Sequence, residues 1–236
     1  MTDKYEILPV KSSSSVPQGF EDIAKEGVLP IHPFFMCVFA SPKSGKSNLI
    51  MNLIFNKNMN FKDRFDAIYW ISPTIDADRT CRHVMDDEEI IKIHEPDDIE
   101  AIDDIMKVIL KEQKDANKEG PFKTLIVMDD MLGRLRGTSL ITTISSKYRH
   151  YNCSFIVVSQ TLKSIDPIIR QCASHWILFK TENQKEFDKI VEEFNGYPDF
   201  ATIYKVNTSD KYTFIYIDIN KVKIHKNFGE IVYIKK

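Results

Sequence analysis

Short apolar runs alternate with segments of helical periodicity through the middle of the chain, and this alternation limits the possible folds most strongly. The apolar runs end at turn-forming or polar residues, as buried strands do, and they are Phe34–Ala40, Phe65–Ile71, Thr124–Met128, Ser154–Val158 and His175–Phe179. Apolar residues spaced by three and four predict helices over Ser47–Phe55, Asp97–Asn117 and Leu140–Arg149, and after a capping box of Thr181 and Gln184. The alternation predicts an α/β fold, with a mainly parallel sheet and helices on both of its faces.

Both ends of the chain depart from this alternation. Ala201–Val206 and Tyr212–Ile219 are expected to be strands on either side of the polar turn Asn207–Lys211, which predicts a C-terminal β-hairpin. Residues 1–30 contain a run of serines followed by proline and glycine, so we expect a peripheral N-terminal segment. We find no internal repeat, and one domain over residues 31–236 is the economical interpretation.

The composition excludes several classes of protein. A hydrophobic fraction of 43% over 236 residues can fill a core, which rules out disorder for the bulk of the chain. Lys and Arg total 32 and Asp and Glu total 34, so the chain is not a polycation as a whole. No apolar run approaches the roughly 20 residues of a transmembrane helix, and the first residues do not resemble a signal peptide, so we expect a soluble protein made in a cytosol. The four cysteines are scattered, without the spacing of a disulfide framework or a zinc site.

The first predicted strand leads directly into a phosphate-binding pattern. Residues Ala40–Ser47 read Ala-Ser-Pro-Lys-Ser-Gly-Lys-Ser, which fits the Walker A motif with alanine in place of the usual first glycine. In such a loop the backbone amides turn inward, and a helix N-terminus points at the same spot. Gly45 permits close approach of the backbone to phosphate, Lys46 would reach the β- and γ-phosphates, and Ser47 would ligate Mg²⁺. We therefore predict ATP and Mg²⁺ as cofactors, with the nucleotide-binding residues Ser41, Pro42, Lys43, Ser44, Gly45, Lys46, Ser47 and Asn48.

Acidic and amide side chains follow two further predicted strands. Thr124–Met128 ends in Asp129 and Asp130, and the next predicted strand along the chain ends just before Gln160. Ligands of open parallel sheets bind at the carboxyl ends of the strands, where these side chains are expected. Asp129 would hold the magnesium shell, Asp130 would orient or deprotonate the attacking water, and Gln160 would sense the γ-phosphate or position water. The simpler alternatives are a turn that starts at the paired acids and an ordinary glutamine at a strand end.

Two arginines stand just before predicted strands. Arg149 precedes the fourth strand and Arg170 precedes the fifth. Either could be an arginine finger supplied to a neighbouring subunit, an effect of about 10³-fold or more on the hydrolysis rate. Individually, such an arginine is more often a surface charge, and the finger role requires that the protein forms rings.

With these residues in place, the chain from about Phe34 to Ile219 resembles the DNA-packaging ATPases of large DNA viruses, of the poxvirus type, within the FtsK–HerA group of P-loop ATPases. The resemblance rests on the Walker A loop, on the strand Leu125–Asp130 and on the segment Arg149–Gln160, with weaker support from Ile168–Ala173 and the terminal hairpin. In that family the Walker A loop often begins with glycine and the second Walker B acid is often glutamate, so Asp130 would have to reach its water with one methylene fewer.

The resemblance implies an ATPase that couples ATP hydrolysis to translocation of double-stranded DNA, and that packages a viral genome into a capsid. It further implies a homo-oligomeric ring and contact with capsid portal or vertex proteins, and it implies no membrane partner. The expected location is the host cytoplasm at the site of viral assembly, and association with the virion stays open.

Other classes of protein remain open at this stage. A P-loop kinase that acts on a small molecule or nucleotide, and not on DNA, would need an arginine-rich lid, and Gly133–Gly137 carries Arg134 and Arg136. The same segment would suit phosphate contacts in a DNA-facing loop. An adaptor protein with a vestigial nucleotide site is a further alternative. A GTPase is disfavoured, because Asn56–Met59 lacks the aspartate of a guanine-reading motif and comes too early in the chain.

Overall fold

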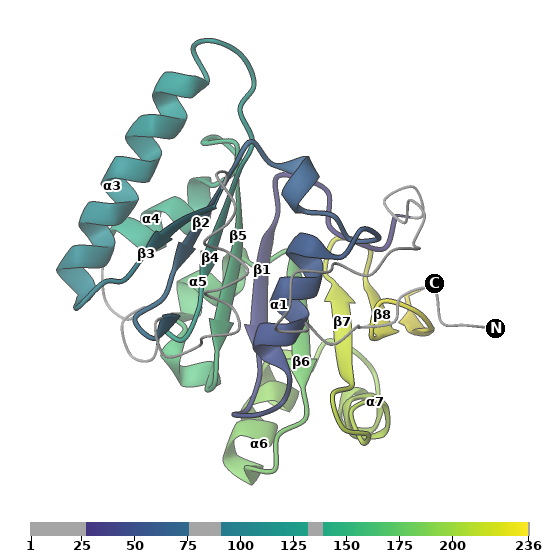
Figure 1. Cartoon of the computed structure of the whole chain (residues 1–236). Coiled ribbons are helices and arrows are strands. Elements are labelled where there is room, and N and C mark those ends of the chain that lie inside the picture. The colour runs from purple at the N-terminus through teal and green to yellow at the C-terminus, as the bar shows by residue number, and fades with distance from the viewer. Residues whose placement is uncertain (1–26, 76–90, 132–138, 236) are drawn as a thin grey trace, which may run out of the picture.

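A computed structural model describes residues 27–75, 91–131 and 139–235 of the chain (Figure 1). The strands are β1 (Phe35–Phe39), β2 (Ala67–Ile71), β3 (Ile91–His94), β4 (Thr124–Met128), β5 (Cys153–Ser159), β6 (His175–Phe179), β7 (Phe214–Asp218), β8 (Lys223–Lys226) and β9 (Ile231–Ile234). The α-helices are α1 (Lys46–Phe55), α3 (Ile99–Ala116), α4 (Ser139–Lys147), α5 (Pro167–Cys172), α6 (Gln184–Glu193) and α7 (Phe200–Asn207). Two short 3₁₀ helices, η2 (Lys62–Arg64) and η4 (Leu162–Ser164), complete the elements.

All nine strands belong to one sheet, in the order β3-β2-β4-β5-β1-β6-β7-β8-β9. The strands from β3 to β6 in this order pair in parallel, and β6, β7, β8 and β9 pair antiparallel. Parallel pairing places the carboxyl ends of β2, β4, β5 and β1 at one edge of the sheet. The predicted fold class is confirmed, and Asp129, Asp130 and Gln160 follow strands that end at this edge.

The strands in the middle of the sheet are buried on both faces. Every residue of β1 is buried, as is every residue of β4 and β5, which explains why these strands appear in the sequence as continuous apolar runs rather than as alternating patterns. Along β1, Phe35 and Phe39 contribute to one hydrophobic cluster, while Met36 and Val38 contribute to the other. Each face therefore has its own core, as two layers of helices require.

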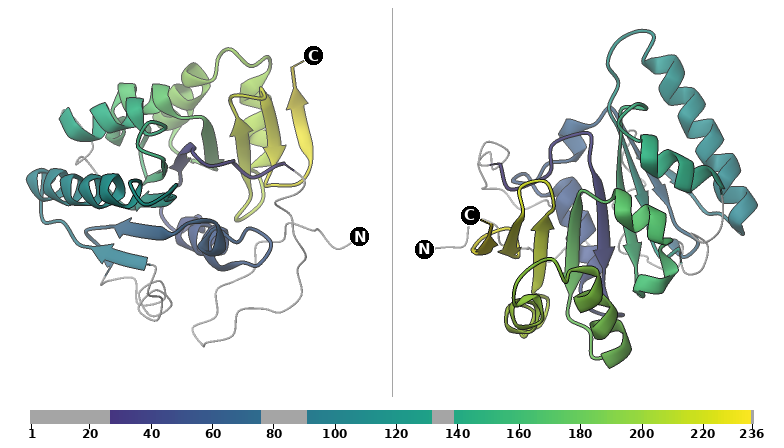
Figure 2. Two further views of the ribbon diagram at one scale, coloured as in Figure 1. Left: turned by 90° about the horizontal axis from the view of Figure 1, so that it is seen from above. Right: turned by 180° about the vertical axis from the view of Figure 1, so that it is seen from behind.

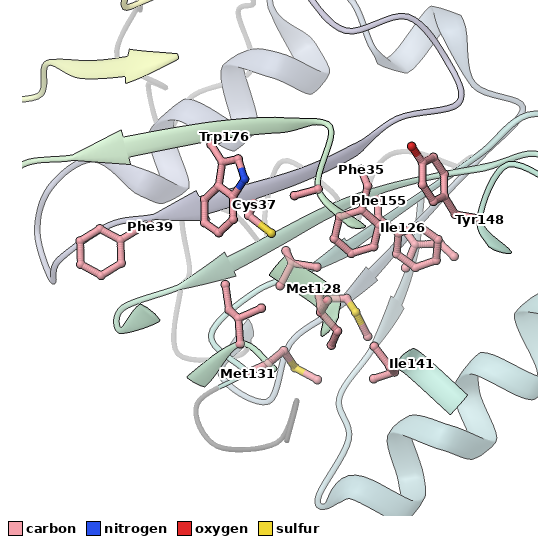
Figure 3. Close-up of a cluster of buried hydrophobic side chains, with 14 of the residues drawn as sticks. Phe35, Cys37, Phe39, Ile126, Met128, Met131, Ile141, Tyr148, Phe155 and Trp176 are labelled. Atoms are coloured by element: carbon pink, nitrogen blue, oxygen red, sulfur yellow. The ribbon is translucent and has the colours of Figure 1, made fainter. Parts of the chain in front are cut away.

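The helices divide unequally between the two faces of the sheet (Figures 1 and 2). On one face, α1 packs through Leu49, Ile50 and Leu53. The other face is covered by α3, α4, α5, α6 and α7, which contribute buried residues such as Ile102 and Tyr204 to the larger cluster. Figure 3 shows part of that cluster around the β1, β4 and β5 side chains.

Two local predictions were wrong. Ala201–Val206, expected as a strand, lies in helix α7, because Phe200 and Tyr204 recur one helical turn apart and both are buried, with the Tyr204 ring packed against Phe187 of α6. The antiparallel C-terminal strands are therefore β7, β8 and β9. The cap of α6 is Asn183, whose side chain accepts hydrogen bonds from the second and third backbone amides of the helix, and not Thr181.

Helix α3 confirms a further expectation about the elements. The predicted helix over Asp97–Asn117 is α3, and the Asp98 carboxylate caps it by accepting a hydrogen bond from the Ala101 amide at 2.8 Å. Within the described residues, no helix is long and apolar enough to span a bilayer. The same part of the chain holds no cluster of three or more His, Cys, Asp or Glu side chains arranged as metal ligands. The peripheral N-terminal segment lies almost wholly outside the described residues, as does Arg134–Arg136.

Candidate active site

The loop between β1 and α1 has the backbone shape that a phosphate-binding loop needs. Lys43 and Gly45 both have positive φ, 62° and 98°, so the chain reverses tightly before α1 begins at Lys46. The Ala40 amide donates to the carbonyl of Ser159 on β5 at 3.0 Å, and the Ser41 hydroxyl donates to the Lys180 carbonyl after β6 at 3.3 Å. These bonds attach the loop to the strands on both sides of β1. No side chain caps α1 and no acid stands in its first turn, which leaves its positive N-terminal end available for an anion.

Lys46 and Asp129 form the central ion pair of the site. The Lys46 Nζ lies 3.1 Å from Asp129 Oδ1, and both side chains are largely buried. The Asp129 backbone amide donates to the Ile71 carbonyl at 2.9 Å, which holds the residue where β4 ends beside β2. Burial raises the pKa of the Asp129 carboxyl, and the nearby Lys46 ammonium acts in the opposite direction. The pair therefore places a carboxylate and an ammonium where β1 and β4 both end.

Asp130 is held by two neutral side chains from neighbouring strand ends. It adopts a positive φ of 54°, which aspartate tolerates better than most residues. Gln160, after β5, donates from Nε2 to Asp130 Oδ1 at 2.7 Å, and Thr74, after β2, donates from Oγ1 to Oδ2 at 3.4 Å. Both oxygens of the carboxylate are thus oriented, and both hydrogen-bonding partners are also able to contact a water molecule or a phosphate.

A cleft of about 360 Å³ joins these groups at the carboxyl edge of the sheet. Its lining residues come from the loops that follow β1, β2, β4 and β5, and they are Pro42, Lys43, Lys46, Ser47, Ser72, Thr74, Ile75, Asp129, Asp130 and Gln160. This volume lies in the range of small-molecule sites. Cations from the loop face carboxylates and amides from the neighbouring strands, which is the arrangement needed to bind a polyphosphate and to position a water beside it.

The predicted nucleotide-binding residues divide into two groups in the structure. Those that line the cleft are Pro42, Lys43, Lys46 and Ser47. The other four, Ser41, Ser44, Gly45 and Asn48, lie in the same loop or in the first turn of α1 but do not line the cleft. The Ser44 Oγ is buried and has no hydrogen-bond partner among the described residues. An unsatisfied hydroxyl at this position is a site where a ligand oxygen would be stabilised.

Neither predicted arginine finger belongs to the cleft of its own chain. Arg149 is exposed before β5, where its Nε donates to the Tyr148 hydroxyl at 3.1 Å and its guanidinium lies 5.5 Å from the centre of the Tyr148 ring. Arg170, on α5, forms an ion pair with Glu193 of α6. Residues that precede parallel strands lie toward the edge opposite the cleft, so a catalytic role for either arginine would require a second subunit.

Three residues of the cleft were not predicted from the sequence, namely Ser72, Thr74 and Ile75. They follow β2, and the sequence pattern predicted only that the strand Phe65–Ile71 ends before them. These residues can be assigned to the cleft only once the order of the strands is known. Strand β2 pairs in parallel with β4, and this pairing brings Thr74 beside Asp130. That pairing is a long-range contact, and the sequence pattern near Thr74 does not reveal it.

Comparison with solved structures finds the same fold in proteins described as ATPases or NTPases. The DNA-packaging ATPase B204 of Sulfolobus turreted icosahedral virus aligns with a TM-score of 0.61 and 15% identity, over 84% of this chain and 98% of that chain. The genome packaging NTPase B204 of Sulfolobus turreted icosahedral virus 2, in complex with ATP-gammaS, gives a TM-score of 0.60 and 17% identity, over 83% of this chain and 96% of that one.

A third similar structure is the cytoplasmic domain of the Type VII secretion ATPase EccC of Thermomonospora curvata. It has a TM-score of 0.60 and 14% identity, over 86% of this chain and 26% of that chain. At these identities the comparisons show the fold.

The family follows from comparison at the level of sequence. No curated protein gives a significant match to the chain. The sequence model of the family described as Poxvirus A32 protein matches residues 24–223, which is most of the chain and includes the phosphate loop and all of the cleft. The chain therefore belongs to the Poxvirus A32 protein family.

Proposed function

We propose that this protein hydrolyses ATP and uses the energy to translocate double-stranded DNA during packaging of a viral genome. The observation that carries the proposal is the cleft in which Lys46 and Ser47 of the phosphate loop face Asp129, Asp130 and Gln160 of the neighbouring strand ends. Structural neighbours described as a genome packaging NTPase and a DNA-packaging ATPase support the link to DNA.

The residues present fit a magnesium nucleotide. Ser47 offers a hydroxyl and Asp129 a carboxylate at the same cleft, and magnesium in nucleotide sites is held by one or two such protein oxygens together with phosphate oxygens and waters. The buried, unpartnered Ser44 hydroxyl and the free N-terminal end of α1 add donors for phosphate. When bound, magnesium would supply positive charge to the phosphate oxygens.

The chain's own residues then account for hydrolysis. Asp130, oriented by Gln160 at 2.7 Å, would accept a proton from the attacking water. Gln160 can donate with the second hydrogen of its amide and accept with its oxygen, so it can position that water while it still holds Asp130. The Lys46 ammonium, which is paired with Asp129, would move toward the nucleotide and stabilise the charge that develops on the transferred phosphoryl group.

Assembly into a homo-oligomeric ring would supply the missing arginine. The structure favours Arg149 over Arg170 for that role, because Arg149 is exposed while Arg170 is already paired with Glu193. Mixing Arg149→Ala subunits with Asp130→Asn subunits should restore turnover through hybrid interfaces. Arg170→Ala subunits in the same mixture serve as the comparison, and restoration only with Arg170→Ala would reverse the assignment. The ring would engage capsid portal or vertex proteins at the site of viral assembly in the host cytoplasm.

The experiment that tests the proposal is ATP turnover by the purified protein with linear duplex DNA, with single-stranded DNA of equal length, and with neither. A motor acting on double-stranded DNA should be stimulated by the duplex more than by the single strand. Turnover that ignores both DNAs, and that needs a small phosphoryl acceptor, would contradict the proposal and indicate a kinase.

A further inference from the structure

An exposed aromatic ring lies directly against the phosphate loop. A Cβ placed on Gly45 would meet Tyr212 Cδ1 at 3.1 Å, with two further atoms of the ring at 3.8 Å. Tyr212 is nevertheless 56% exposed, so one part of the ring covers the loop and the rest faces solvent. The residue stands between α7 and β7, far from Gly45 in sequence.

Sheet topology explains how the ring comes to this place. β7 pairs antiparallel with β6, and Phe214 at its start is opposite Phe179 at the end of β6. The start of β7 therefore lies at the same edge of the sheet as the carboxyl ends of the parallel strands. The turn that carries Tyr212 is thus beside the phosphate loop, on the side of β1 where β6 and β7 lie.

The turn holds the ring in a defined position. Tyr212 has a φ of 66°, a left-handed conformation that is unfavourable for a bulky residue and needs support from its surroundings. The Thr213 hydroxyl donates to the Asp210 carbonyl at 2.8 Å, and the Phe214 amide donates to Asn227 Oδ1 at 3.1 Å. The Lys211 ammonium lies 4.7 Å from the centre of the Tyr212 ring. These contacts present the aromatic surface before any ligand arrives.

The direction of a bound nucleotide follows from the order of the strands. The groups proposed to act on the γ-phosphate, Asp130 and Gln160, follow β4 and β5, which lie on one side of β1. The phosphate loop follows β1 itself. A triphosphate that starts at those groups and crosses the loop continues toward β6 and β7, where Tyr212 is exposed. The base of the nucleotide would then reach the aromatic ring.

We propose that the ring of Tyr212 is the platform on which the base of the bound nucleotide stacks. The inference rests on the proposed function in so far as the loop must bind a nucleotide. It adds a positioning residue from the C-terminal part of the chain to a site otherwise built from the loops after β1, β2, β4 and β5. Stacking between a base and an aromatic side chain is worth about 1–3 kcal/mol, which is about a 5- to 150-fold change in affinity.

Isothermal titration of two ligands tests this assignment. ADP carries the base, and inorganic tripolyphosphate carries only the phosphates. Tyr212→Asn removes the ring but suits the left-handed backbone, and Tyr212→Phe keeps the ring. We expect Tyr212→Asn to weaken ADP binding about tenfold and to leave tripolyphosphate binding within about twofold, while Tyr212→Phe binds both ligands as the wild type does.

The other outcomes would overturn the assignment. Equal weakening of both ligands by Tyr212→Asn would mean that the ring supports the phosphate loop rather than the base. Unchanged ADP affinity together with loss of oligomers in sedimentation would assign the ring to a subunit interface. Absence of ADP binding by the wild type would overturn both this inference and the proposed function. ADP binding that depends on the ring, combined with turnover that ignores DNA, would contradict only the translocase.

Discussion

Replacing Asp130 with asparagine removes the proposed general base while it keeps the shape of the side chain. Asparagine has nearly the same shape and tolerates the φ of 54° at this position, so the backbone should not move. The amide oxygen can still accept the hydrogen bond from Gln160, but a charge-assisted bond becomes a neutral one. That exchange costs about 1 kcal/mol, which corresponds to a decrease of roughly 2–4 °C in Tm for a domain of this size.

The effect on turnover should be far larger than the effect on stability. Asparagine cannot accept a proton from water, and loss of a general base lowers rates by about 10²- to 10⁴-fold, or about 3–5 kcal/mol in the activation free energy. ATP turnover by phosphate release, ADP affinity by titration and Tm by calorimetry should be measured on the same preparation. We expect near-normal ADP affinity, a small decrease in Tm and almost complete loss of turnover.

One result would refute this assignment of roles. If Asp130→Asn turns over ATP within about threefold of the wild type, a loss of less than 1 kcal/mol, then Asp130 is not the base. Gln160→Ala provides a matched comparison, because it removes the residue that orients Asp130 and leaves the carboxylate in place. Its turnover should fall by less than that of Asp130→Asn.

Three further predictions concern other parts of the structure. Gly45→Ala should lower ADP affinity and cost about 1–2 kcal/mol in unfolding experiments, because φ is 98° there and the added methyl group meets the Tyr212 ring; an unchanged Tm would contradict this. Burial lowers the pKa of His175 from its ordinary value of 6.5 to about 4. Between these two pH values the imidazole of the unfolded chain is protonated and that of the folded chain is not. Unfolding free energy should therefore fall by about 2 kcal/mol between about pH 7 and pH 5, and urea titrations of His175→Gln should show a correspondingly smaller fall. Arg170→Ala should destabilise by about 1–3 kcal/mol because Glu193 loses its partner, and adding Glu193→Ala should restore part of the loss in urea titrations; full stability of the single variant would show that the ion pair is not structural.

The features that could be predicted from the sequence are those formed by consecutive residues. Ala40–Ser47 combines a strand end, a loop and a helix start within eight letters, and Thr124–Asp130 combines a buried strand with its terminal acids. Each pattern has one common structural solution, so both segments could be assigned to a strand, a loop or a helix start before the fold was known.

The features that were missed depend on contacts between distant segments. Ala201–Val206 is rich in β-branched and aromatic residues, which favours a strand, and it becomes helical because Phe200 and Tyr204 are buried on the same side. Thr74 enters the site only because β2 pairs with β4. Tyr212 is in place because β7 runs antiparallel to β6. Sheet order decides the positions of Thr74 and Tyr212, and local periodicity does not encode sheet order.

The measurement that tests the central claim most directly is ATP turnover by purified wild type, Lys46→Ala and Lys57→Ala. Lys57 is an exposed lysine in the turn after α1, so its replacement controls for loss of one surface charge near the same helix. We predict magnesium-dependent turnover by the wild type and by Lys57→Ala. For Lys46→Ala we predict no turnover above background, with a cooperative unfolding transition whose Tm is lowered because the buried Asp129 carboxylate loses its partner. Turnover by folded Lys46→Ala at the wild-type rate would contradict the assignment of this cleft as the site of ATP hydrolysis.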